Sequence, residues 1–167
     1  MTDVGLDIYT CEIKSCVTRN HQTLDHMKSK KKPSKKRANK LAPSRKYVNK
    51  IMDWCLKTYG KSKYNRYFPE IQYRKGEYMI EDPRVMAFYD SEDDVIFINK
   101  DDHATIYQLA STIIHEYTHY KQNQTHYDVL SKYLPYHKNP MEIEANKIAK
   151  RDARKCVKEI LSGKSSK

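Results

Sequence analysis

The chain has 167 residues, of which 38% are hydrophobic and 32% are charged, so it can form one domain with a core, and part of it is expected outside that core. The net charge is +11, almost all of it from one segment near the N-terminus. Four scattered cysteines exclude a disulfide framework, no apolar run approaches the roughly 18 residues of a membrane span, and no secretory signal is visible. We therefore expect a soluble, intracellular protein with reduced thiols and no membrane contact, in the cytoplasm or nucleus. The Lys-, Asn- and Tyr-rich composition suggests an AT-rich genome, so a virion-associated protein is a further option.

The first motif is a regular series of zinc-type ligands at residues 11–26. Its four members are spaced at intervals of five residues: Cys11, Cys16, His21 and His26. Two cysteines and two histidines are an acceptable structural zinc set. The series resembles retroviral zinc knuckles, although those begin with Cys-x2-Cys and end in Cys. Two interpretations stay open, a small zinc knuckle or four unrelated side chains.

A basic segment follows, and it accounts for the net charge. Lys28–Lys46 contains ten Lys and Arg residues and no acidic residue, whereas the rest of the chain has 22 basic and 21 acidic residues. With Pro33 and Pro43 as breakers, this predicts a flexible basic N-terminal arm over residues 1–43, ahead of a domain over residues 44–167. The arm is a candidate for contact with nucleic acid phosphates. A nuclear-import patch and a solubilising tail are the alternatives.

The first helix is predicted between Ser44 and Gly60. Ser44 suits an N-cap and Gly60 suits the position after a helix C-terminus. Hydrophobic residues between them follow the i, i+3, i+4 spacing of one helix face: Val48, Ile51, Met52, Cys55, Leu56 and Tyr59.

Three short strands are predicted next, at Ile71–Arg74, Val85–Tyr89 and Val95–Asn99. The last two are separated by Asp90–Asp94, whose composition is typical of a turn, so they form a predicted hairpin.

Two further helices complete the predicted domain. One spans Ala104 to Gln122 and has an apolar face. A polar, tyrosine-rich connection, Asn123–Lys138, precedes the other, which starts with Asn139 as N-cap and Pro140 at the first helical position. Its predicted buried stripe is Met141, Ala145, Ile148, Ala149, Ala153, Cys156 and Ile160. The element order predicts an α+β fold, with helices on one face of a small, mostly antiparallel sheet.

The motif with the clearest chemistry is His115-Glu-Tyr-Thr-His119, a His-Glu-x-x-His sequence on the second helix. Residues at i and i+4 share a helix face, so both imidazoles can reach one Zn²⁺ at about 2.0–2.1 Å. Glu116 can then serve as the general base that takes a proton from an activated water. The alternative is a solvated helix face.

A catalytic zinc needs a third protein ligand, and several residues compete for that place. We favour Glu142, because Asn146 follows it at i+4 and could fix the tautomer of a ligand histidine. Glu142 could instead be the N3 partner of Asn139 in a capping box. The other candidates are Glu144, His126 and His137.

These motifs resemble those of the gluzincins, in which His-Glu-x-x-His is followed by Glu-x-x-x-Asp on the next helix; Asn146 departs from the Asp. The form of the second motif is similar to that of the ImmA/IrrE-type branch, and the small size resembles that of the minigluzincins. The resemblance implies a zincin-like fold with an active-site helix and a C-terminal ligand helix. It also implies that zinc is bound by His115, His119 and Glu142, and that Val85–Tyr89 is the sheet edge that binds peptide. Gluzincins usually add an oxyanion-stabilising Tyr or His, for which the candidates here are Tyr127, Tyr133, Tyr136, His126 and His137.

The function predicted from the sequence is that of a zinc-dependent endopeptidase acting on a protein or peptide substrate, with Glu116 as the catalytic residue. One alternative resembles the SprT-like proteases, recruited to DNA through the arm, although that group uses a third histidine. The other alternative is a non-catalytic nucleic-acid-binding or regulatory protein with a zinc fold.

Overall fold

The computed structural model describes residues 42–75 and 85–163. The predicted knuckle at residues 11–26 and the predicted arm up to residue 41 lie outside the described residues. In chain order the elements are α2 (Arg45–Tyr59), β1 (Glu70–Arg74), β2 (Ala87–Asp90), β3 (Val95–Asn99), α3 (Ile106–Lys121), α4 (Gln124–Tyr133), η2 (Tyr136–Lys138) and α5 (Pro140–Ser162).

The predicted ends of α2 are confirmed. Ser44 has extended backbone dihedral angles and precedes the helix, and Gly60 follows it with a φ of 66°. A positive φ favours glycine because it has no Cβ, which explains why the helix stops at this residue. The predicted apolar face of α2 is buried at Val48, Ile51, Met52 and Cys55.

The sheet has the strand order β1-β3-β2 and is mixed, so the prediction of a mostly antiparallel sheet is wrong. The predicted hairpin is present, because β2 and β3 pair in antiparallel fashion around the Asp90–Asp94 turn. β1, however, pairs in parallel with β3. The reason is that β2 reverses the chain direction before β3 is formed, and β1 lies beside β3 rather than beside its sequence neighbour. The edges of the described sheet are therefore β1 and β2.

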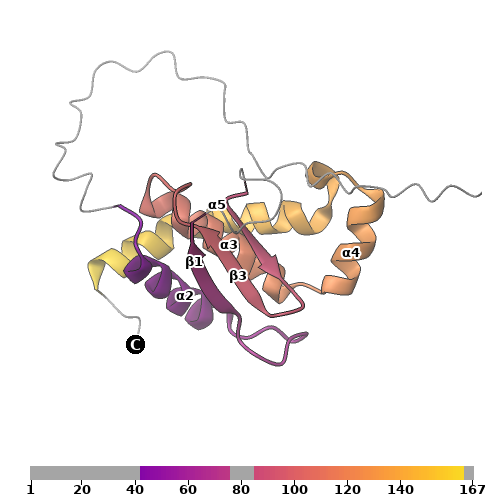
Figure 1. Ribbon diagram of the computed structural model, residues 1–167, viewed down its shortest axis with the longest axis horizontal. Helices are drawn as coiled ribbons and strands as arrows, with labels where there is room; N and C mark the ends of the chain where they lie inside the picture. The colour runs from indigo at the N-terminus through magenta and orange to yellow at the C-terminus, as the bar shows by residue number, and fades with distance from the viewer. Residues whose placement is uncertain (1–41, 76–84, 164–167) are drawn as a thin grey trace, which may run out of the picture.

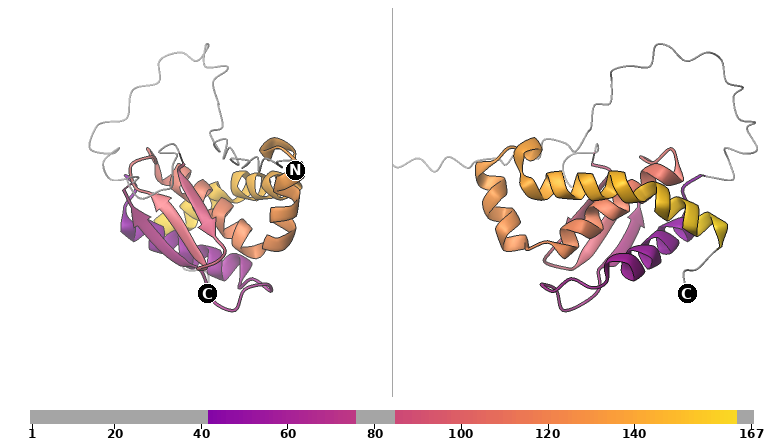
Figure 2. Two further views of the ribbon diagram at one scale, coloured as in Figure 1. Left: turned by 45° about the vertical axis from the view of Figure 1, so that its right-hand side comes forward. Right: turned by 180° about the vertical axis from the view of Figure 1, so that it is seen from behind.

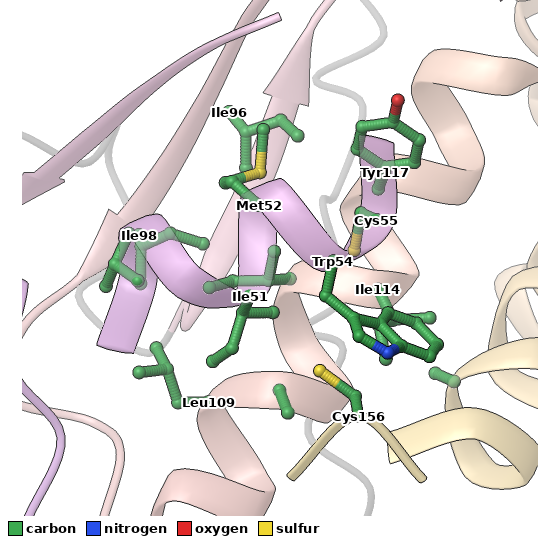
Figure 3. Packing of buried hydrophobic residues seen from close by; sticks show 14 of the residues in the cluster. Ile51, Met52, Trp54, Cys55, Ile96, Ile98, Leu109, Ile114, Tyr117 and Cys156 are labelled. Carbon is green, nitrogen blue, oxygen red and sulfur yellow. The ribbon is translucent and has the colours of Figure 1, made fainter. Parts of the chain in front are cut away.

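Helices α2 and α3 pack on one face of the sheet, and α5 packs against these two helices, as Figure 1 shows with the sheet in front and the right-hand view of Figure 2 shows from behind. The result is the predicted α+β class. Figure 3 shows the core between these layers, where Ile51 and Met52 lie near Ile96 and Ile98, and Cys156 contributes from α5. Cys55 and Cys156 are buried and form no disulfide bond with a described residue.

Small side chains line the buried stripe of α5. Ala145, Ala149, Ala153 and Cys156 are buried, whereas the larger members of the predicted stripe are only partly so. Small residues allow two helix backbones to approach closely, so α5 packs along α3. No helix in the described part of the chain is long and apolar enough to cross a membrane.

The segment Asn123–Lys138 was predicted only as a polar connection between two helices. It contains the ten-residue helix α4 and the 3₁₀ turn η2, neither of which was predicted from the sequence. None of the α4 residues is buried, which explains why no apolar periodicity marks it in the sequence. Its start is set by Asn123, whose Oδ1 accepts a hydrogen bond from the His126 backbone N–H at 3.1 Å. As Figure 1 shows, α4 stands beside the other helices and leads into α5.

Candidate metal centre

Helix α3 brings the two histidines of the sequence motif together. His115 and His119 are one helical turn apart, and each is only 8% exposed. Their Nε2 atoms lie 3.0 Å from each other, and the ring planes meet at 76°. Two ring nitrogens this close have their lone pairs directed at the same small volume, which is the arrangement that a shared metal ion requires.

Glu142 enters the same volume from α5. It is 3% exposed, and its carboxylate oxygens lie 3.3 Å from His115 Nε2 and 3.5 Å from His119 Nε2. Tetrahedral ligands at about 2.0–2.1 Å from an ion are about 3.3–3.4 Å apart, so the three separations fit one such ion. Glu142 Oε2 is buried without a hydrogen bond from a described residue, which leaves it available as a ligand. His115, His119 and Glu142 thus form a buried group that could hold a metal ion.

The structure decides against the capping-box alternative for Glu142. Asn139 caps α5 through its Oδ1, which accepts a hydrogen bond from the Met141 backbone N–H at 3.0 Å. The Glu142 carboxylate contacts the histidines and the hydroxyl of Tyr127 instead of the Asn139 backbone.

Gln122, rather than Asn146, contacts the Nδ1 nitrogen of His119, on the side of the ring away from Glu142. Gln122 Oε1 lies 2.9 Å from His119 Nδ1, and its Nε2 donates to Met141 O and to Glu144 Oε2, each at 3.0 Å. Asn146 Nδ2 donates to Tyr136 Oη at 3.3 Å, and among the described residues no hydrogen bond joins Asn146 to His115 or His119, so our expectation for Asn146 is wrong. Sequence reasoning missed Gln122, although its position at i+3 from His119 on the same helix face was a usable signal.

Glu144, one of the other candidates for the third ligand, contacts Gln122 rather than the two histidines. Its carboxylate accepts a hydrogen bond from the Gln122 amide, which in turn contacts His119. Glu144 lies outside the group of potential metal ligands. The reason is that Glu142 and Glu144 are two positions apart on α5 and so project from different sides of the helix.

Tyr127 is the member of the tyrosine and histidine candidates that the structure brings into the site. Its hydroxyl donates to Glu142 Oε1 at 2.6 Å, and its ring meets the His119 ring edge-on with centroids 5.2 Å apart. Tyr133, His126 and His137 are exposed, and Tyr136 bonds to Asn146. Tyr127 reaches the centre because α4, which the sequence did not reveal, turns it toward α5.

His119 and Glu142 shift each other's pKa values in the directions that favour their charged forms. Burial disfavours the charged form of Glu142, but His115, His119 and Tyr127 outweigh burial and hold the pKa of this carboxyl far below its usual range. Burial likewise lowers the pKa of His119, yet its contact with Glu142 and the negative charges of Glu116 and Glu142 raise the pKa above its usual value. The centre thus carries negative charge that favours a cation.

Glu116 is buried on α3 next to His115, with 7% of its surface exposed. Its charge acts on both His119 and Tyr127, which places it at the edge of the same centre. The ion pairs of the two histidines are with Glu142 and not with the Glu116 carboxylate. A buried carboxylate beside a metal site can accept a proton from a water molecule.

Comparison of the chain with protein-family models, with curated proteins and with solved structures found no match. Any assignment of function to this centre is therefore argued from its own residues.

Proposed function

We propose that the protein is a zinc-dependent endopeptidase with a zincin-like, gluzincin-type site. The observation that carries the proposal is the spacing of the three buried ligand groups. Two His-Glu-x-x-His nitrogens and one carboxylate from the next long helix lie 3.0–3.5 Å from one another. Three protein ligands with a fourth position left for water or substrate are typical of catalytic rather than structural zinc.

The roles of the residues follow from this arrangement. When bound, zinc would supply a Lewis acid that polarises the substrate carbonyl and lowers the pKa of water toward about 7. Glu116 takes the proton as the water oxygen attacks the carbonyl carbon, and passes it to the amide nitrogen when the C–N bond breaks. The products are a carboxylate and an amine.

The substrate is proposed to bind along β2. This strand lies at one edge of the described sheet and packs against α3, which carries the histidines. An extended peptide can pair with such an edge through main-chain hydrogen bonds that do not depend on its sequence. The same edge position was expected from the resemblance for Val85–Tyr89, and the strand itself spans Ala87–Asp90.

The presence of Glu142 among the three potential ligands disfavours the SprT-like alternative. The SprT-like reading needs a third histidine, whereas His126 and His137 lie outside the group of potential ligands among the described residues. Recruitment of the protein to DNA stays a prediction, and so does the alternative of a non-catalytic nucleic-acid-binding or regulatory protein.

The first test is zinc content by elemental analysis of protein purified without chelators, for the wild type and for Glu142→Ala. We expect one zinc per chain in the wild type, lost or much weakened in the variant. Absence of zinc from the wild type would overturn the proposal.

The second test is cleavage of an unfolded, fluorescently labelled protein by zinc-loaded enzyme. Glu116→Gln should retain zinc and lose cleavage, whereas Glu92→Gln, in the exposed β2–β3 turn, should leave both unchanged. Zinc binding with no cleavage sensitive to Glu116 would favour the non-catalytic alternative.

A further inference from the structure

The loop between α2 and β1, residues 60–69, concentrates basic and aromatic side chains on the surface. It contains three cations, Lys61, Lys63 and Arg66, and no acidic residue. Three large rings in it are about half exposed or more: Tyr64 at 48%, Tyr67 at 63% and Phe68 at 56%. The loop lies along the lower edge of Figure 1, away from the helix–sheet core. Exposed aromatic side chains grouped in this way indicate a binding surface.

Each ring has a cation beside it. Lys63 Nζ lies 4.9 Å from the centroid of the Tyr64 ring, and the guanidinium of Arg66 lies 5.5 Å from that of Tyr67. In the third pair, Lys61 Nζ lies 5.8 Å from the centroid of the Phe68 ring. These distances are within cation–π range, so the surface presents flat rings and positive charges side by side.

Hydrogen bonds to α3 and β2 fix the backbone of the loop that carries these rings. Tyr120, from α3, donates its hydroxyl to Tyr67 O at 2.9 Å and accepts from the Ser62 backbone N–H at 3.1 Å. Asn65 Nδ2 donates to the Tyr89 hydroxyl at 2.8 Å and to Tyr120 O at 3.1 Å. A surface that is ordered before binding loses less conformational entropy on binding.

A cavity of about 580 Å³ continues this surface between the loop and α3. Lys63 and Tyr64 of the loop line it, together with Lys121 from α3 and His126 from α4. Tyr59 and Tyr117 add aromatic surface, and the remaining lining is mostly amide, hydroxyl and aliphatic. The one acidic residue in the lining, Glu144, is bound to Gln122.

We propose that the 60–69 loop and this cavity form a binding site for single-stranded nucleic acid. Unpaired bases stack on aromatic rings, and neighbouring Lys and Arg side chains neutralise the phosphates, which is the combination found here. A lipid surface also attracts basic and aromatic residues, but the cavity lining includes Lys63, Gln122 and Asn123, whose side chains can hydrogen-bond to a base or a phosphate and not to an acyl chain. The proposal does not depend on the metal centre or on peptidase activity.

The test is fluorescence anisotropy with labelled oligothymidylate of about 20 nucleotides, which exceeds the length that one such site covers. The full chain is used, so the basic N-terminal segment is present in every variant. Replacing the rings in Tyr64→Ala/Tyr67→Ala/Phe68→Ala should raise the Kd about a hundredfold or more, because each of three stacked bases contributes roughly fivefold or more. The matched control is Tyr133→Ala, whose ring is 80% exposed on α4, and its Kd should equal that of the wild type.

Two further measurements separate stacking from charge. The ring variant should weaken binding of the single strand more than binding of a duplex of the same length, since paired bases do not stack on protein rings. Lys63→Gln/Arg66→Gln should lower the slope of log Kd against log salt by about 1.4, whereas Lys132→Gln/Lys138→Gln on and beyond α4 should not.

An unchanged Kd in the ring variant, with native circular dichroism, would overturn the proposal. So would equal losses for single strand and duplex. Binding to vesicles of phosphatidylcholine and phosphatidylserine in equal parts, without binding to the oligonucleotide, would assign the surface to lipid instead.

Discussion

Gln122 Oε1 faces His119 Nδ1 at 2.9 Å, and the surroundings of Gln122 fix the direction of this hydrogen bond. Its NH₂ group donates to two oxygens, Met141 O and Glu144 Oε2, so Oε1 must be the acceptor. His119 Nδ1 therefore carries a proton, and in the neutral ring the Nε2 lone pair is directed at Glu142 and His115. The Gln122 side chain thus holds His119 in the tautomer that metal coordination through Nε2 requires.

Removing this support should weaken metal binding without abolishing it. We expect Gln122→Met to raise the Kd for zinc about 10- to 100-fold, because the tautomer and orientation of His119 are no longer fixed. Competition with a chromophoric chelator measures the change. Gln122→Glu keeps an acceptor oxygen and should recover part of the affinity, and Gln124→Met, at a residue whose amide donates to Asp128 on α4, is the matched control. Equal Kd values for all variants would refute the positioning role.

The hydroxyl of Tyr127 should stabilise both the fold and the site. Tyr127→Phe removes a donor to the buried Glu142 carboxylate, and hydrogen bonds to charged groups are worth about 1.5–3 kcal/mol. We expect a lower free energy of unfolding in urea for the metal-free protein, and a smaller loss when zinc supplies the missing partner. Tyr133→Phe, at an exposed site on the same helix, should change neither value.

Metal removal should lower the melting temperature, because the ligands come from two helices that only the folded chain brings together. An ion at about 100 times its Kd stabilises the native state by about 2.7 kcal/mol. Differential scanning fluorimetry with zinc and with a chelator should separate the two states of the wild type. Glu142→Ala should show little separation, and a full zinc-dependent shift in that variant would contradict the assigned ligand.

Asp152 should contribute to stability at neutral pH and not in acid. The bidentate contact with Arg151, aided by the 2.6 Å hydrogen bond from the Tyr59 hydroxyl, holds the pKa of this carboxyl below its usual range. A carboxyl with a lowered pKa stabilises the fold above its unfolded pKa of about 4 and loses that contribution as the pH falls through the folded value. Urea unfolding should therefore show that Asp152→Asn is destabilised at pH near 7 and converges with the wild type in acid. Asp53→Asn, exposed on α2, should follow the wild type throughout.

Local sequence was sufficient where one element carries the whole signal. The His115 and His119 pair needs only the i, i+4 geometry of a helix, the limits of α2 follow from Ser44 and Gly60, and the start of α5 follows from the Asn139–Pro140 pair. The β2–β3 hairpin follows from its acidic turn. Helix α4 could not be found in this way, because its residues bury no apolar face and its start depends on the Asn123 cap.

The amino-acid sequence by itself thus determined the α+β class, the helix that carries the two histidines and the short list of third ligands. Only the tertiary structure decided among them, because α5 approaches α3 through its small residues and carries Glu142, not Glu144, to within 3.5 Å of both imidazoles. It also decided that β1 joins β3 in parallel and that Gln122 rather than Asn146 orients His119. These contacts join residues far apart in sequence or depend on how two elements pack. The periodic spacing of hydrophobic residues in a sequence, by contrast, indicates only which face of a single helix or strand is buried.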